Sequence, residues 1–175
     1  AGRRPLACAA VAGSLDLCRL LLAARASVDG RGTSGAAAVA AASQQQEDGE
    51  EGGVTPLSIA AGAGNVKLAA LLLEAGASTE IEDERGCRPL MAAARSNSPA
   101  LMAELLRARA NVEARQAETG KTALVFAAGV GGAEACAALL GARADVQAST
   151  ASGVTALHAA AANGHREVCD QLLAA

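Results

Sequence analysis

Aromatic side chains are almost absent from this 175-residue chain, which has one Phe and neither Tyr nor Trp. Hydrophobic residues nevertheless make up 51% of it, and they are mainly Ala, Leu and Val. Small and medium side chains suit closely packed helices but fill a deep globular centre poorly. The composition therefore predicts one domain with a thin, repetitive core.

Other absences exclude whole classes of function. With 15 basic and 18 acidic residues the net charge is -3, so the chain lacks the basic surface that holds nucleic acid. Its longest apolar run without Gly or charge, 36–42, is far short of the roughly 20 residues that span a bilayer. The five Cys form no CxxC pair, which argues against a zinc knuckle or a disulfide framework. We expect no nucleic acid partner, no membrane insertion and an intracellular, reducing compartment, most simply the cytoplasm, with an organelle as the alternative.

A unit of about 33 residues recurs along the chain, and such a period is the signature of a stacked-repeat architecture. The motif Gly-x-x-Pro/Ala-Leu starts at Gly2, Gly53, Gly86, Gly120 and Gly153. After the Leu of each motif come paired alanines, a polar turn and a Leu-rich stretch. Each unit therefore predicts two short antiparallel helices and an extended finger. Such a unit cannot bury its apolar face alone, so we expect the units to stack on one another.

The second unit shows the local signals most clearly. Thr55 is placed to cap the first helix, and Pro56 stands at its first position, where a missing N–H costs nothing. Asn65 is placed to cap the second helix, and Gly76 to end it. The matching caps of the second helices in the first and third units are Ser14 and Ser98.

These residues resemble the ankyrin repeat, whose T-P-L-H-x-A signature matches residues 55–60 and 155–160. The last unit adds Asn163-Gly164-His165, also typical of that family. The resemblance covers nearly the whole chain except residues 31–52, and it implies an all-α solenoid of stacked helix-turn-helix units with extended hairpin fingers. The units lie near 1–30, 53–85, 86–119, 120–152 and 153–175.

Two departures from the family pattern involve arginine. Arg4 and Arg88 replace the capping Thr, which costs about 1 kcal/mol each, so the first and third units are predicted to fray sooner. Arg25, Arg109 and Arg143 stand where the family usually has Gly after the second helix, and a non-Gly residue in a left-handed cap is strained. There they complement the helix dipole or form a basic ladder for an acidic partner.

The insertion and the last helix carry further expectations. Residues 31–52 combine a helix-forming stretch, 36–43, with an acidic, Gly-rich stretch, 47–53. They are either a low-complexity loop or a degenerate first helix. At the other end, Leu172 and Leu173 leave an apolar helix without a polar terminal unit. We therefore expect that the parent chain continues, or that a partner or larger complex covers both leucines.

We find no constellation of residues for catalysis, a cofactor or a metal. His158 and His165 lack a matched third ligand and are expected to bond to finger or turn backbone. The glycines of 129–132 follow a helix and lack Lys-Ser/Thr behind them, which indicates an inter-helix turn. A solvated charged finger tip is expected for the acidic cluster Glu80, Glu82, Asp83 and Glu84.

The cysteines and the one Phe are assigned by their place in the unit. Packing in the second helix explains Cys18, Cys136 and Cys169. Cys8 and Phe126 are expected in the core on first helices. Cys87 is expected to be exposed between finger and helix, which would make it the most reactive thiol.

The resemblance implies a non-catalytic module that binds another protein on the concave surface of its fingers and first helices. The family's variable contact positions map to Glu84, Arg85, Cys87, Arg95, Glu118, Thr119, Lys121 and Val130. Of the side chains enriched at binding hot spots, Trp, Tyr and Arg, the chain has only Arg, so we expect contacts that weaken with salt. The alternatives are a structural subunit of a stable assembly, or the ankyrin portion of a larger enzyme or channel.

Overall fold

The computed structural model describes residues 5–30 and 53–175, whose helices form five pairs. The pairs are α1 (Pro5–Val11) with α2 (Leu15–Ala23), α4 (Pro56–Gly62) with α5 (Val66–Glu74), α6 (Pro89–Arg95) with α7 (Pro99–Arg107), α8 (Ala123–Val130) with α9 (Ala133–Gly141), and α10 (Ala156–Ala162) with α11 (Arg166–Ala174). No β-strand forms in the described ranges. The insertion predicted at 31–52 and the residue Arg4 lie outside them.

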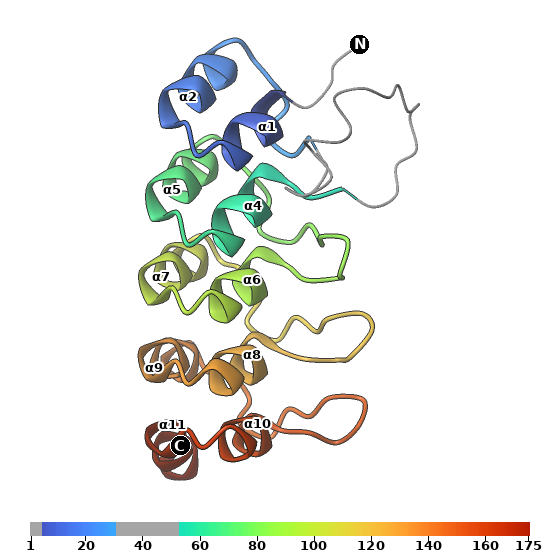
Figure 1. Ribbon diagram of the computed structural model, residues 1–175, viewed down its shortest axis with the longest axis vertical. Coiled ribbons are helices and arrows are strands. Elements are labelled where there is room, and N and C mark those ends of the chain that lie inside the picture. The colour runs from blue at the N-terminus through green and yellow to red at the C-terminus, as the bar shows by residue number, and fades with distance from the viewer. Residues whose placement is uncertain (1–4, 31–52) are drawn as a thin grey trace.

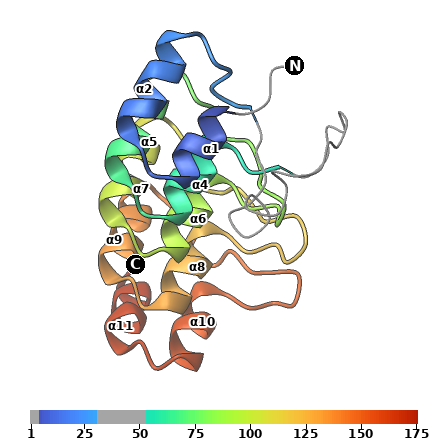
Figure 2. The same cartoon turned by 45° about the horizontal axis from the view of Figure 1, so that its top comes forward.

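The pairs stack along one axis (Figure 1). The first helix of every pair lies in one column and the second helix in a parallel column, and each helix contacts its counterpart in the next unit. The loops that join the units project from the first-helix column, and they stay on that side when the molecule is turned (Figure 2). This arrangement confirms the predicted all-α solenoid with fingers.

The first helices begin at the predicted caps. Thr55 accepts a hydrogen bond from the Ser58 amide at 3.1 Å, and Pro56 occupies the first turn. Thr122 and Thr155 cap their helices in the same way. Arg88 stands at the same place without a side-chain cap bond, as predicted. The amide of Met91, which a Thr at this place would satisfy, donates instead to the Arg88 carbonyl at 3.0 Å.

The second helices follow the prediction with one exception. Ser14 and Asn65 accept hydrogen bonds from the amides of Leu17 and Leu68. Ser98 also stands at the N-cap but makes no such bond. Its ψ of 82° is close to the 87° of Asn65, so the backbone at this cap does not explain the missing bond. The prediction that Ser98 caps this helix is therefore wrong.

Left-handed residues end the second helices. Arg25, Arg109 and Arg143 have φ of 58°, 63° and 65°, and Gly76 has 87°. The left-handed conformation lets two successive amides donate to carbonyls of the last helical turn. In the third unit the amides of Arg109 and Ala110 donate to the carbonyls of Leu106 and Leu105, both at 3.0 Å. The predicted strained caps are therefore present, and all three Arg residues are exposed. Whether they act as a basic ladder stays a prediction.

A continuous apolar layer lies between and within the two columns. Its fully buried leucines are Leu6, Leu57, Leu68, Leu72, Leu90, Leu101, Leu105, Leu124 and Leu139. Cys18 and Cys136 are buried and Cys169 is half-buried, as the packing interpretation predicted. Leu172 occupies the same position as Leu72 and is only 4% exposed, so the expectation that it needs an outside partner is wrong. Leu173, by contrast, is 71% exposed.

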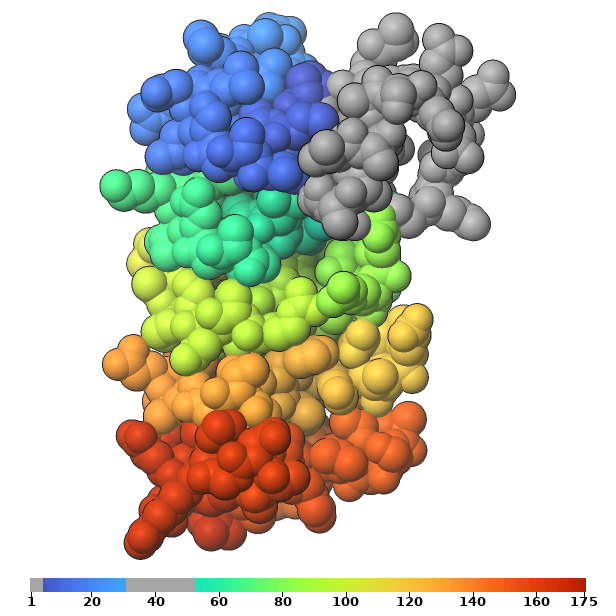
Figure 3. Space-filling model, viewed as in Figure 1, coloured from blue at the N-terminus to red at the C-terminus, as the bar shows by residue number. Residues whose placement is uncertain are grey.

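Each unit forms a slab about one helix layer thick (Figure 3). The slabs succeed one another from the N-terminal to the C-terminal unit without mixing, so each contacts only its neighbours. In the described part of the chain, no helix combines the length and the apolar character that crossing a membrane requires.

Candidate interaction surface

We call the loops 75–88, 108–122 and 142–155 the fingers. Each closes on itself through a backbone hydrogen bond of 2.9 Å. The amides of Asp83, Gln116 and Thr150 donate these bonds to the carbonyls of Cys87, Lys121 and Val154. Side chains of the same three donor residues also bond within their own finger tips. Each finger is therefore an ordered hairpin whose tip is closed by its own backbone and side-chain hydrogen bonds.

Neighbouring fingers are joined by a ladder of acidic residues. Asp29, Glu80 and Glu113 occupy the same place in three units, and each carboxylate accepts a backbone amide of the next finger. The donors are Ser78 at 3.0 Å, Asn111 at 2.9 Å and Asp145 at 2.8 Å. We call these three contacts the carboxylate ladder. The sequence analysis missed it, although an acid stands three residues after each of the equivalent residues Ala26, Ala77 and Ala110.

The acidic cluster at the finger after α5 is mostly engaged in the fold. Glu80 forms an ion pair with Arg88 at 2.7 Å, and Glu82 lies 3.4 Å from the same guanidinium. One oxygen of Asp83 accepts the amides of Arg85 and Cys87, both at 2.9 Å. Among the described residues, Glu84 alone of the cluster has no bonded partner for its carboxylate. The side chains of Glu80 and Glu82 are still 43% and 39% exposed, so the tip is solvated as expected but is also bonded within the fold.

Cys87 is buried, with 2% exposure, so the expectation of an exposed thiol is wrong. It closes the finger hairpin, and the adjoining finger packs against this turn: a Cβ added at Gly86 would lie 3.1 Å from the Cβ of Ala117. Burial raises the pKa of the Cys87 thiol, and the carboxylate of Asp83 raises it further. This thiol is therefore neither accessible nor activated.

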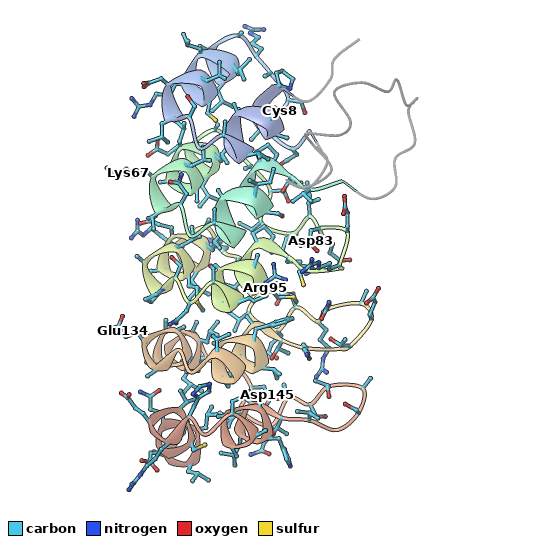
Figure 4. The ribbon with its side chains drawn as sticks, viewed as in Figure 1. Cys8, Lys67, Asp83, Arg95, Glu134 and Asp145 are labelled. Carbon is cyan, nitrogen blue, oxygen red and sulfur yellow. The ribbon has the colours of Figure 1, made fainter. Side chains whose placement is uncertain are left out.

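Three predicted contact residues gather around Cys87. Burial raises the pKa of the Cys87 thiol, and the smaller influences on it include the charges of Arg95, Arg85 and Glu118. The Gln116 side chain donates to the Arg85 carbonyl at 2.7 Å, so the fingers that carry Arg85 and Glu118 are in contact. All three side chains are exposed, and each comes from a different element: α6, the finger before it, and the finger after α7. In Figure 4 Arg95 stands on α6 beside the finger that carries Asp83. The structure thus brings together residues that lie 33 positions apart.

Cys8 lies on the outer side of α1 and is exposed, so its expected core position is wrong (Figure 4). The repeat places it in one row with Ile59 and Phe126, which are both half-buried. In the third unit the equivalent residue, Ala92, is only 2% exposed, so exposure in this row differs from unit to unit. Phe126 packs only partly against the core.

Phe126 belongs to the surface as well as to the core, which sequence reasoning did not recognise. The Lys121 ammonium lies 5.6 Å from the centroid of its ring, within range of a cation–π contact. Val130 follows Phe126 by four residues in α8 and is 42% exposed. Since residues four apart share one side of a helix, Phe126 and Val130 present a continuous apolar strip.

Thr119 shapes its finger. Its hydroxyl donates to the Gln116 side chain at 2.6 Å, and its carbonyl accepts the amide of Ala151 in the next finger at 3.1 Å. Glu118, immediately before it, is exposed. The two predicted contact residues therefore differ in role: Thr119 is hydrogen-bonded within the fold, whereas the exposed side chain of Glu118 can contact a partner.

Both histidines serve the fold, as predicted. His158 Nδ1 lies 2.8 Å from the Thr155 hydroxyl in a capping box. His165 Nε2 lies 3.1 Å from the Gly129 carbonyl of the preceding unit, which also accepts the Asn163 side-chain amide at 3.0 Å. Within residues 5–30 and 53–175, no three His, Cys, Asp or Glu side chains come close enough to hold a metal ion.

Comparison with known families agrees with this geometry. The family model described as ankyrin repeats (3 copies) matches residues 38–116 and 90–175, and the first match begins inside the segment predicted as an insertion. No curated protein matches the chain. With most of its length covered by these two matches and its helix pairs stacked along one axis, the chain belongs to the ankyrin-repeat family.

Proposed function

We propose that the chain is a non-catalytic module that binds a partner protein on one surface, the finger face. The finger face comprises Glu84, Arg85, Arg95, Glu118, Lys121, Phe126 and Val130. Ankyrin repeats are generally protein-interaction modules. The proposal concerns where this member binds and which of its side chains carry the contact.

The distribution of bonded and unbonded charges supports this assignment. Contacts within and between fingers already engage the charged groups of Glu80, Asp83 and Arg88. In contrast, Arg85 and Arg95 are exposed and form no ion pair with another described residue. Charges that the fold does not use keep their full capacity to meet charges of a partner, with an energy that falls as salt rises.

Phe126 gives the finger face an apolar centre. It is the single aromatic residue of the chain and is half-buried, with Lys121 over its ring. Aromatic side chains beside charged groups are typical anchors of protein interfaces, because they bury a large area at low entropic cost. Val130 extends the strip along α8. The partner side chains that fit are aliphatic or aromatic groups next to charged ones.

Two of the eight residues predicted from the family's contact positions have a different part in this proposal. Cys87 is too deeply buried to touch a partner, and Thr119 holds the finger that presents Glu118. The other six remain, joined by Phe126.

The experiment compares capture of proteins from the native source by immobilised wild-type chain and by two variants. The finger-face variant combines Arg95→Ala with Phe126→Ala, and the control is Arg107→Ala, an exposed residue of the second-helix column. For each captured protein, we expect the affinity to fall in the finger-face variant, to stay unchanged in the control and to weaken with added salt. A partner that binds all three chains equally would refute the assignment of the finger face.

A further inference from the structure

One position of the repeat carries a different kind of side chain in the third unit. The residue before the first helix is Thr55, Thr122 or Thr155 in three other units, and its hydroxyl accepts an amide of the first helical turn. Arg88 stands there in the third unit, with φ and ψ of -82° and 160° against -74° and 156° at Thr55. The backbone is therefore nearly the same, and only the side chain differs. The third unit gives up a cap bond that these three units make.

The guanidinium of Arg88 is bound within the finger that precedes its helix. Its Nη1 donates to Glu80 Oε2 at 2.7 Å, and its Nε lies 3.4 Å from Glu82 Oε1. Glu80 and Glu82 come before the finger tip, which Asp83 marks in Figure 4, and Arg88 comes after it. A guanidinium is a planar group with five donors, so one arginine can reach two carboxylates. Arg88 therefore ties one limb of the finger to the other.

Glu80 carries this restraint into the next finger. One of its carboxylate oxygens holds Arg88, and the other accepts the Asn111 amide at 2.9 Å. Its counterparts Asp29 and Glu113 each accept an amide in the same way, but neither forms an ion pair with another described residue. Among the described contacts of the carboxylate ladder, the one from Glu80 is therefore the one that a cation holds in place.

The finger that Arg88 ties together is the one that carries Glu84 and Arg85 into the finger face. Both side chains are exposed, and both lie between Glu82 and Arg88 in the chain. We infer that Arg88 is a positioning residue of the finger face, which fixes the place of Glu84 and Arg85 relative to the next finger. Its effect on binding rests on the proposed function, whereas its effect on the order of the two fingers does not.

The test replaces Arg88 by Thr, the residue that three other units have at this place. Because Thr55 stands before Pro56 with nearly the same backbone, Arg88→Thr should keep the fold, which circular dichroism and the urea midpoint check. Hydrogen exchange of the Asn111 amide should become about two- to fivefold faster, the factor that corresponds to the loss of a partly exposed ion pair. Arg88→Lys keeps a positive charge and should recover part of the protection.

The matched control is Arg166→Thr, which removes an arginine from an ion pair within α11, away from the fingers. Exchange at Asn111 should not change in this control. Two results overturn the inference: exchange at Asn111 that stays at the wild-type rate in Arg88→Thr, or exchange that speeds up equally in Arg166→Thr.

A second measurement connects the finger to binding. It uses a captured protein whose affinity falls in the finger-face variant that combines Arg95→Ala with Phe126→Ala. The affinity for that protein should fall by a similar factor in Arg88→Thr, recover in part in Arg88→Lys and stay unchanged in Arg166→Thr. An affinity that is unchanged in Arg88→Thr overturns the positioning role and leaves the finger face assigned. If no captured protein depends on the finger-face variant, the proposed function fails, and hydrogen exchange at Asn111 alone decides whether Arg88 fixes the fingers.

Discussion

Replacing Leu72 by Ala tests the stacking that underlies the fold. Leu72 is 0% exposed and lies in α5, with helices of its column on both sides. The change removes three carbon atoms, worth about 2.4 kcal/mol at roughly 0.8 kcal/mol per buried carbon group. A cavity between helices fixed on two sides collapses incompletely, which brings the expected loss to about 3 to 4 kcal/mol, within the 2 to 5 kcal/mol typical of such changes.

The assay is urea denaturation followed by far-ultraviolet circular dichroism, because the chain has neither Trp nor Tyr to report by fluorescence. For a chain of this length, a loss of 3 kcal/mol lowers the melting temperature by about 6 to 12 °C. Leu173→Ala is the matched control, since that leucine is 71% exposed and should cost little. If Leu72→Ala lost no more stability than the control, the assigned register of the helices would be wrong.

Three other predictions follow from described contacts. Gly76→Ala should destabilise the fold by about 1 kcal/mol because φ at this position is 87°; no atom lies within 4 Å of the added Cβ, so the cost comes from the backbone alone. Gly141→Ala, in a helix, should stabilise the fold slightly. Equal shifts of the two variants in the urea midpoint would contradict this prediction. Glu113→Ala should speed hydrogen exchange of the amide it accepts in the next finger, and unchanged exchange would remove the carboxylate ladder as a restraint. Native Cys8 should be alkylated far faster than Cys136, as mass spectrometry can show, because Cys8 is exposed and burial raises the pKa of the Cys136 thiol to about 11. Above pH 9 this thiol ionises first in the unfolded chain, so the free energy of unfolding should fall towards pH 11. A flat stability profile in that window would contradict the prediction.

The sequence predicted the architecture because the architecture is periodic. The caps at Thr55 and Asn65 and the left-handed turns at Arg109 and Arg143 depend on a few neighbouring residues, so they could be placed from the motif. Ser98 shows the limit of that reasoning, because it stands at the N-cap with nearly the same ψ as Asn65 and still makes no side-chain bond to the helix.

The surface was harder to predict, because exposure depends on neighbouring units. Cys8 was expected to be buried and is exposed, whereas Cys87 was expected to be exposed and is buried where the adjoining finger packs against its turn. Glu80 is exposed, as expected of a solvated charge, but it also bonds Arg88 and a backbone amide 31 residues away, which the sequence did not indicate. The repeat period alone shows which residues are equivalent in successive units, but it does not show which side chains or backbone groups they contact.

The carboxylate ladder has a mechanical consequence. Since Glu80 and Glu113 each hold a backbone amide of the adjoining finger, a tilt imposed on one finger pulls on the next through a short, directional bond. A ligand that displaces one finger must therefore also strain the hydrogen bonds that connect it to its neighbours. Substitutions several units from a bound ligand would alter how tightly it is held without touching it.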